Sequence, residues 1–133
     1  MDTRVDWEQA LVHEDLRFTR YGRPVSVLVV DVRPAGDTAL DDAARRVGEI
    51  VRDLARAPDR VTRVSQRRFH VLLPETDEAA ALSLGSRIGR AVRSASLDDG
   101  VGRRCEVVSA AAAPAHGSTL ADAIRLAQAR VAE

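Results

Sequence analysis

The stretch Arg63-Val64-Ser65-Gln66-Arg67-Arg68-Phe69-His70-Val71-Leu72-Leu73-Pro74 decides the fold. Two short runs rich in β-branched and apolar residues, 61–64 and 69–73, stand on either side of a polar break. This pattern predicts an antiparallel hairpin whose tip is Ser65-Gln66-Arg67-Arg68. A hairpin needs further strands and helices to cover it, so the rest of the chain has to supply a sheet.

The residues around the hairpin predict two more strands. Residues 25–32 are almost continuously apolar, which is typical of a central strand covered on both faces. Residues 104–113 form the second candidate, after a loop of turn-forming residues at 97–102. We therefore expect four strands, with 25–32 the most deeply buried.

Apolar residues at helical spacing predict four helices. The first helix covers residues 6–21 and places Trp7, Leu11, Phe18 and Tyr21 near one face. The second starts around Thr38 and Asp41 and runs to residue 56. The third is capped by Thr76, and the fourth is capped by Ser118. The resulting order is helix, β-α-β-β-α-β, helix. This order predicts an α+β domain with a mostly antiparallel central sheet flanked by helices, spanning residues 1–133, with 1–22 as a leading helix.

Composition narrows the class of protein. The 133 residues suit one domain, and the formal net charge of zero gives no bulk field for nucleic acid or an anionic membrane. All 20 basic residues are arginine, which fits compositional bias or, alternatively, an anionic partner. Cys105 is the single cysteine, and no stretch reaches 18 apolar residues, so we expect no internal disulfide, no membrane span and a cytoplasmic location.

The hairpin resembles the signature hairpin of the GGDEF domains of diguanylate cyclases, which read Arg-x-Gly-Gly-Asp/Glu-Glu-Phe-x-x-Leu-Leu-Pro. The matching positions are Arg63, Phe69, Leu72, Leu73 and Pro74. Residues 11–26 are similar to the entry helix of these domains, and residues 107–111 are similar to a later strand. The resemblance extends from Leu11 to the C-terminus and implies a nucleotide-cyclase-like fold.

The catalytic part of the signature is degenerate. Ser65 and Gln66 stand at the two glycine positions, and Arg67 and Arg68 stand at the two acidic positions before Phe69. In the family, an acid after the first strand and an acid of the hairpin hold the metal, and only Asp31 matches the first of them. Arginine cannot ligate a cation, so we expect Asp31 to be a vestigial metal position that organises the loop after its strand.

The tip itself is expected to be an exposed basic turn, with phosphate binding by Arg67 and Arg68 as the alternative. The family's guanine-binding asparagine and phosphate-binding lysine are also missing. The resemblance with these departures predicts a chain that is not an enzyme and needs no cofactor or metal.

One ligand-binding pattern of the family is retained. Diguanylate cyclases often carry an inhibitory product site, Arg-x-x-Asp, five residues before the signature, and Arg56-Ala57-Pro58-Asp59 matches it. Arg87 stands where a second arginine is usual. Arginine forks bind phosphates and guanine edges, and a carboxylate accepts guanine N–H groups, so the three residues are candidates for cyclic di-GMP binding. The competing interpretation is that Arg56 and Asp59 only close the turn after a helix.

These observations predict an inactive GGDEF-like regulatory or binding module of bacterial-type signalling. Its partners would be cyclic di-GMP through Arg56, Asp59 and Arg87, or another protein. One alternative is a structural domain without a nucleotide ligand that forms a homodimer through the hairpin face or the first helix, or binds a partner. The other alternative is a residual diguanylate cyclase or another nucleotide-processing activity.

Overall fold

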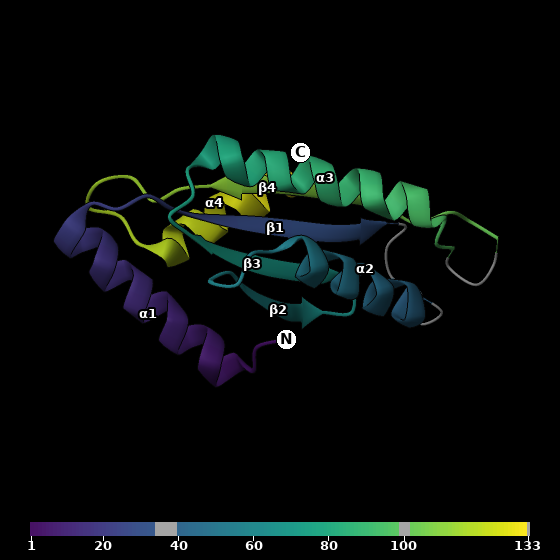
Figure 1. Ribbon diagram of the computed structural model, residues 1–133, viewed down its shortest axis with the longest axis horizontal. Helices are drawn as coiled ribbons and strands as arrows, with labels where there is room; N and C mark the ends of the chain where they lie inside the picture. The colour runs from purple at the N-terminus through teal and green to yellow at the C-terminus, as the bar shows by residue number, and fades with distance from the viewer. Residues whose placement is uncertain (34–39, 99–101, 133) are drawn as a thin grey trace.

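Four antiparallel strands form one sheet in the order β2-β3-β1-β4, and helices lie on both of its faces (Figure 1). The structure is a computed structural model that describes residues 1–33, 40–98 and 102–132. Its elements are α1 (Arg4–Tyr21), β1 (Val25–Arg33), α2 (Leu40–Leu54), β2 (Arg60–Ser65), β3 (Arg68–Pro74), α3 (Glu78–Ala95), β4 (Glu106–Ala112) and α4 (Leu120–Ala132). The predicted α+β class and the predicted order of elements are confirmed.

The hydrophobic run of β1 explains its place inside the sheet. Every residue from Val25 to Val32 is buried, and β1 pairs with β3 on one side and β4 on the other. A strand that is apolar on both faces is stable only where helices cover both faces of the sheet. The hairpin β2–β3 lies beside β1, so the Asp31 end of β1 pairs with the Arg68 end of β3.

Two hydrophobic cores lie on opposite faces of the sheet. Leu28, Val30 and Phe69 face α2 and α3, whereas Val27 and Val29 face α1 and α4. The packing between α3 and the sheet is close: a Cβ added at Gly85 would lie 2.5 Å from the Ser109 hydroxyl oxygen. The alternation along β1 therefore distributes its side chains between two layers of helices.

Two helices begin one residue later than the sequence predicts. Asp77, and not Thr76, caps α3, because the Asp77 side chain accepts the Ala80 N–H. Thr119, and not Ser118, caps α4: its hydroxyl accepts the Asp122 N–H, and the Asp122 carboxylate accepts the Thr119 N–H in return. The predicted start of the second helix at Thr38 lies outside the described residues.

The helix α1 packs on the sheet through the predicted face of Trp7, Leu11 and Phe18, but Tyr21 does not belong to that face. Trp7 is buried, and its ring lies 6.3 Å from that of His70 on β3. Tyr21 is exposed, because the helix ends at Gly22 beyond the edge of the sheet. Among the described residues, no helix is both long enough and apolar enough to cross a membrane.

Candidate functional site

The turn Arg56-Ala57-Pro58-Asp59 joins α2 to β2 and is closed by Asp59. One carboxylate oxygen, Oδ2, accepts the Arg56 backbone N–H at 2.7 Å, and the Asp59 N–H donates to the Arg56 carbonyl at 3.0 Å. The Asp59 side chain is only 2% exposed, so the turn keeps it in a fixed position. Pro58 cannot continue the preceding helix, which explains why the chain turns here.

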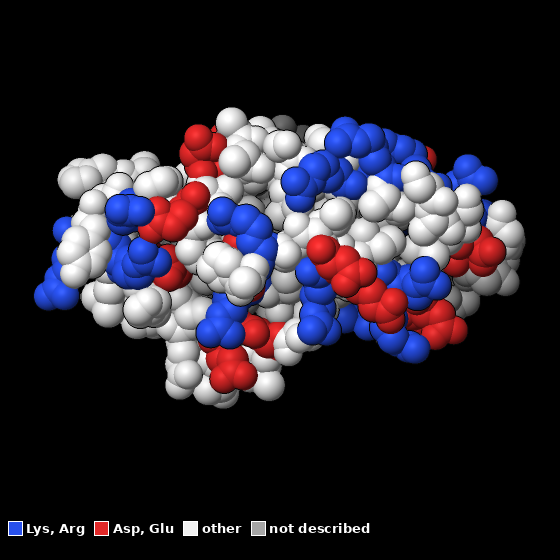
Figure 2. Space-filling view, in the orientation of Figure 1, with Lys and Arg blue, Asp and Glu red and all other residues white. Residues whose placement is uncertain are grey.

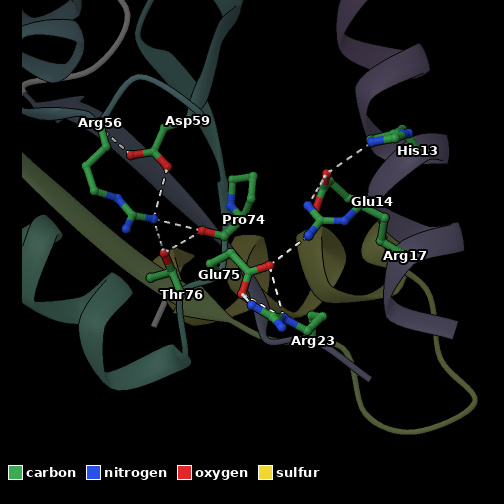
Figure 3. A network of polar contacts seen from close by, with 9 residues as sticks. All are labelled: His13, Glu14, Arg17, Arg23, Arg56, Asp59, Pro74, Glu75 and Thr76. Carbon is green, nitrogen blue, oxygen red and sulfur yellow. Dashed lines mark hydrogen bonds and ion pairs between the residues drawn. The ribbon is translucent and has the colours of Figure 1, made fainter. Parts of the chain in front are cut away.

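The Arg56 guanidinium reaches across to the segment after β3. Its Nη2 donates to the Pro74 carbonyl and to the Thr76 hydroxyl, both at 2.8 Å, and lies 3.6 Å from Asp59 Oδ1 (Figure 3). Asp59 Oδ1 is buried and has no hydrogen-bond partner among the described residues. A buried carboxylate oxygen without a donor is unusual and favours an additional donor at this point.

The third predicted residue lies at the same place. Arg87 projects from α3, and its Nη2 donates to the carbonyl of Leu54 at the end of α2 at 3.3 Å. Arg56, Asp59 and Arg87 line one open surface pocket of about 290 Å³, together with Leu54, Leu73, Glu75, Thr76, Ala80, Ser83 and Leu84. The structure thus brings Arg87 of α3 together with the two residues of the Arg56–Asp59 turn, and ligand binding by the three stays a prediction.

Positive charge surrounds this pocket on the α3 side. Arg87, Arg90 and Arg93 are exposed on α3, and Figure 2 shows arginine side chains gathered over that helix. On the rest of the face in view, acidic and basic side chains are mixed. An anionic ligand would therefore be attracted to the α3 side of the pocket although the whole chain is neutral.

Glu75 and Thr76 are site residues that the sequence analysis did not identify as such. Thr76 was expected to cap a helix but instead accepts from Arg56 and donates to the Pro74 carbonyl. Glu75, at a φ of 55°, turns the other way and binds Arg17 of α1 at 2.7 Å and Arg23 at 2.8 Å (Figure 3). Their position directly after the Leu-Leu-Pro end of the hairpin could have marked them as residues near the site. The sequence does not show, however, that Glu75 points to α1 and Thr76 to Arg56.

The hairpin tip forms a second polar cluster, and its geometry corrects two predictions. Arg68 is not part of an exposed turn, and Asp31 does not merely organise a loop: the guanidinium donates to both carboxylate oxygens, at 2.6 and 2.9 Å. Both residues are paired in the β1–β3 ladder, and the Asp31 side chain is only 3% exposed. The predicted hairpin is confirmed, but its turn is shorter than predicted: β2 ends at Ser65 and β3 begins at Arg68, so only Gln66 and Arg67 lie in the turn.

The electrostatics of this cluster disfavour a metal ion at Asp31. Burial acts to raise the pKa of the Asp31 carboxyl, but the hydrogen bonds and the charge of Arg68, with Arg33 and Arg67 nearby, outweigh it and hold the pKa below its usual range. Both oxygens already accept from a guanidinium, so Mg²⁺ would have to displace Arg68. Within residues 1–33, 40–98 and 102–132, no group of three His, Cys, Asp or Glu side chains is placed to hold a metal. The donor set at Asp31 therefore does not fit a magnesium ion.

Comparison with solved structures identifies the fold. The chain is similar to the GGDEF domain of DgcB from Caulobacter crescentus in complex with c-di-GMP, at a TM-score of 0.82 and 17% identity over 96% of this chain and 81% of that one. It is also similar to the GGDEF domain of PA1120 (YfiN or TpbB) from Pseudomonas aeruginosa, at a TM-score of 0.83 and 21% identity over 98% and 88% of the two chains. No protein-family model matches the sequence, and no curated protein matches it either.

A third similar structure corrects the prediction about catalysis. The active GGEEF domain of a diguanylate cyclase from Vibrio cholerae matches at a TM-score of 0.81 and 16% identity, over 96% of this chain and 85% of that one. The prediction that the chain is not an enzyme is therefore wrong as it was drawn: the fold is an enzyme fold, and the loss of the signature acids does not establish inactivity. The predicted GGDEF-like fold itself is confirmed.

Proposed function

From the GGDEF fold and the pocket at the Arg56–Asp59 turn, we propose that this chain is a regulatory domain that binds cyclic di-GMP. The whole of residues 1–133 would act as one cytoplasmic domain. The observation that carries the proposal is the convergence of Arg56, Asp59 and Arg87 on one pocket with an unsatisfied carboxylate oxygen. We favour cyclic di-GMP over other anions because the structurally similar GGDEF domain of DgcB was solved in complex with c-di-GMP.

The residues of the pocket suggest how the ligand would be held. A guanine edge carries adjacent N–H donors, and Asp59 Oδ1 is a buried acceptor that receives no hydrogen bond from the described residues. Arg56 covers this oxygen at 3.6 Å, so the guanine would take the place of the guanidinium beside Oδ1. Arg56, which is exposed over about half of its side chain (55%), would then turn outward to a phosphate.

Arg87 would contribute the second positive charge. Its hydrogen bond to the Leu54 carbonyl is long at 3.3 Å, so little is lost when the side chain turns toward a phosphate. A pocket of about 290 Å³ accommodates one guanine and the adjoining phosphate, and the rest of the ligand would remain on the surface. We therefore expect moderate affinity that weakens as salt concentration rises.

Calorimetric titration with cyclic di-GMP tests the proposal. We expect saturable binding that is stronger than for GTP with magnesium, and we expect Asp59→Asn to weaken it about 5- to 150-fold, the range for a lost hydrogen bond to a charged group. Asparagine keeps the size of the side chain and an oxygen for the Arg56 N–H, so the turn should survive. Because the fold is a cyclase fold, the same protein should be incubated with GTP and magnesium and analysed for product.

Two results would reject the proposal. One is the absence of heat or competition at any ligand concentration that can be reached. The other is binding that Asp59→Asn and Arg87→Ala both leave unchanged, because the ligand would then lie elsewhere on the molecule. Circular dichroism of each variant shows whether a loss of binding comes from unfolding.

A further inference from the structure

Two surface pockets meet at the Arg56–Asp59 turn. One is the candidate ligand pocket that contains Arg87, the Arg87 pocket. The other, the Asp2 pocket, has a volume of about 390 Å³ and is lined by Asp2 together with the turn itself. Because Arg56 and Asp59 line both pockets, the two are neighbours, and a ligand held in one can reach the other.

The edge strand β2 holds Asp2 in place. The Asp2 N–H donates to the Val61 carbonyl at 2.8 Å, and the Asp2 carbonyl accepts the Thr62 hydroxyl at 3.1 Å, so the N-terminus lies beside β2 (Figure 1). Among the described residues, two buried side-chain oxygens have no hydrogen-bond partner: Asp2 Oδ2 and Asp59 Oδ1. Both belong to residues that line the Asp2 pocket, and unpaired buried acceptors favour a ligand that carries donors.

The two pockets repeat one arrangement of charges. In each, an arginine that is about half exposed lies beside a carboxylate with one unpaired oxygen. Arg56 lies 3.6 Å from Asp59 and is 55% exposed, and Arg60 lies 3.4 Å from Asp2 and is 50% exposed. The contact of Arg60 is long, so little is lost when another donor takes its place beside Asp2.

Each pocket also contains a second arginine. Arg87 occupies this position in the Arg87 pocket, and Arg52, in the last turn of α2, occupies it in the Asp2 pocket. Within the part of the chain that the structure describes, the exposed Arg52 makes no hydrogen bond or ion pair, so it is free to bind an anion. A guanine with its phosphate supplies both an N–H edge for the carboxylate and negative charge for the arginines.

We propose that the Asp2 pocket is a second half-site, which takes the second guanine and phosphate of the same cyclic di-GMP molecule. The two halves of this ligand are chemically identical, and the Arg87 pocket holds only one of them. One guanine would donate to Asp59 and the other to Asp2, while Arg52 and Arg60 bind the second phosphate. The inference rests on the proposed function, because it places the half of the ligand that the Arg87 pocket leaves on the surface.

A second guanine contact makes the domain selective among cyclic dinucleotides. Adenine carries an acceptor, its ring N1, where guanine carries an N–H donor, so a carboxylate rejects adenine. The mixed cyclic dinucleotide of guanosine and adenosine would satisfy Asp59 but not Asp2. If Asp59 alone read a base, cyclic di-GMP would exceed the mixed ligand only by a statistical factor of about two, since it can bind in two equivalent orientations.

Calorimetric titration with the two cyclic dinucleotides tests the second half-site. We expect the wild type to bind cyclic di-GMP about 5- to 150-fold more tightly than the mixed ligand. Asp2→Asn should weaken cyclic di-GMP binding and remove this preference, because an asparagine amide can donate to adenine. Asp53→Asn removes the same charge from an exposed position of α2 outside the lining of both pockets, so it should change either affinity by less than about 3-fold.

The outcomes separate this inference from the proposed function. If cyclic di-GMP does not bind the wild type, both are rejected. If binding depends on Asp59 but the mixed ligand binds as tightly within the statistical factor, the second half-site is refuted and the proposed function stands. Arg52→Ala gives a check that does not involve the packing of Asp2: it should weaken cyclic di-GMP binding about 5-fold or more without lowering the thermal unfolding midpoint. Unchanged affinity in this variant would also overturn the second half-site.

Discussion

At the scale of single residues, the Arg68–Asp31 pair determines what the hairpin tip can hold. The Asp31 carboxylate is buried and receives both of its donors at 2.6 and 2.9 Å from one guanidinium. Arg68→Met would remove both of these hydrogen bonds and leave the carboxylate with the Arg33 guanidinium at 3.6 Å, and we expect unfolding free energy to fall by about 1–3 kcal/mol at pH 7. Urea unfolding followed by circular dichroism measures this. Arg67→Met, which removes a charge but no hydrogen bond to Asp31, should change stability by less than about 0.5 kcal/mol.

The same variant should also shift the acid limit of stability. In the wild type the folded pKa of Asp31 lies below its usual value of 3.8, so the pair stabilises the fold above that value and its contribution is lost only as the pH falls further. Without Arg68, burial would dominate and raise the pKa, and stability would begin to fall at a higher pH. Equal acid limits for wild type and Arg68→Met would show that the pair is not formed in solution.

Arg87 and Arg90 provide a matched pair on α3 for the proposed ligand pocket. Both are exposed, but only Arg87 lines the pocket. We expect Arg87→Ala to weaken cyclic di-GMP binding about 5- to 150-fold and to reduce its salt dependence, whereas Arg90→Ala should change affinity less than about 3-fold. Calorimetry at two salt concentrations measures both effects. Equal losses in the two variants would indicate general electrostatic attraction and not a defined site.

The site residues illustrate what local sequence can predict. Arg56 and Asp59 belong to one turn and were found from their spacing, and Arg87 was found from the resemblance to a family. The Asp31–Arg68 pair was not found, because it depends on the cross-strand register, which brings residues 37 positions apart into contact. The same holds for Glu75: its partners Arg17 and Arg23 lie more than 50 residues away in sequence.

At the scale of elements, hydrophobic periodicity predicted every helix and strand, but not where each helix begins. Thr76 and Ser118 were plausible caps by residue type, and in the structure each stands one residue before the true cap, at Asp77 and Thr119. Neighbouring Ser, Thr and Asp residues all cap well, so composition alone does not choose among them. Which residue becomes the cap depends on how the whole helix packs on the sheet, because this packing determines where the helix begins.

Two glycines of α3, Gly85 and Gly89, allow the effect of close packing on stability to be distinguished from the effect of helix propensity. A Cβ at Gly85 would lie 2.5 Å from the Ser109 hydroxyl oxygen and 3.3 Å from Leu28, so Gly85→Ala should push the helix from the sheet and destabilise the fold by about 1–3 kcal/mol. At Gly89 the nearest atom is 3.6 Å away and belongs to Arg93, so Gly89→Ala should stabilise by about 0.5–1 kcal/mol. Thermal unfolding compares them directly. A stabilising Gly85→Ala would mean that α3 lies farther from β4 than described.

At the scale of the whole molecule, α1 is held on the body by apolar packing of Leu11 and Phe18 and by further contacts along its length. Trp7 packs against His70, the Asp15 carboxylate accepts the Leu120 N–H at the start of α4, and Arg17 binds Glu75 after β3. Glu75 is adjacent in sequence to Thr76, which accepts from Arg56 in the candidate pocket. The segment Pro74–Thr76 therefore contacts both α1 and the pocket, with Pro74 buried and Glu75 exposed.

His70 makes the attachment of α1 sensitive to acid. It is buried between Trp7 and Gln128, and burial, reinforced by the Arg68 charge and opposed by Asp31, lowers its pKa from 6.5 to about 4. The unfolded chain therefore binds a proton between these two pH values that the folded chain does not, so stability is complete above about pH 6.5 and decreases as the pH falls toward 4. We expect a loss of about 2–3 kcal/mol over this window.

The loss of unfolding free energy can be measured by urea unfolding at several pH values. The fluorescence of Trp7, the single tryptophan, follows unfolding at the contact with His70 itself. His70→Phe keeps an aromatic ring against Trp7 but cannot take up a proton, so its stability should fall by about 2–3 kcal/mol less than that of the wild type between pH 6.5 and 4. The loss that remains comes from carboxyls such as Glu75, whose pKa is lowered by its hydrogen bond with Arg23. His13→Ala removes an exposed histidine of α1 and should retain the wild-type slope. If His70→Phe loses as much stability as the wild type across this window, the sensitivity arises elsewhere, and the acid response of the molecule does not depend on the contact between α1 and β3.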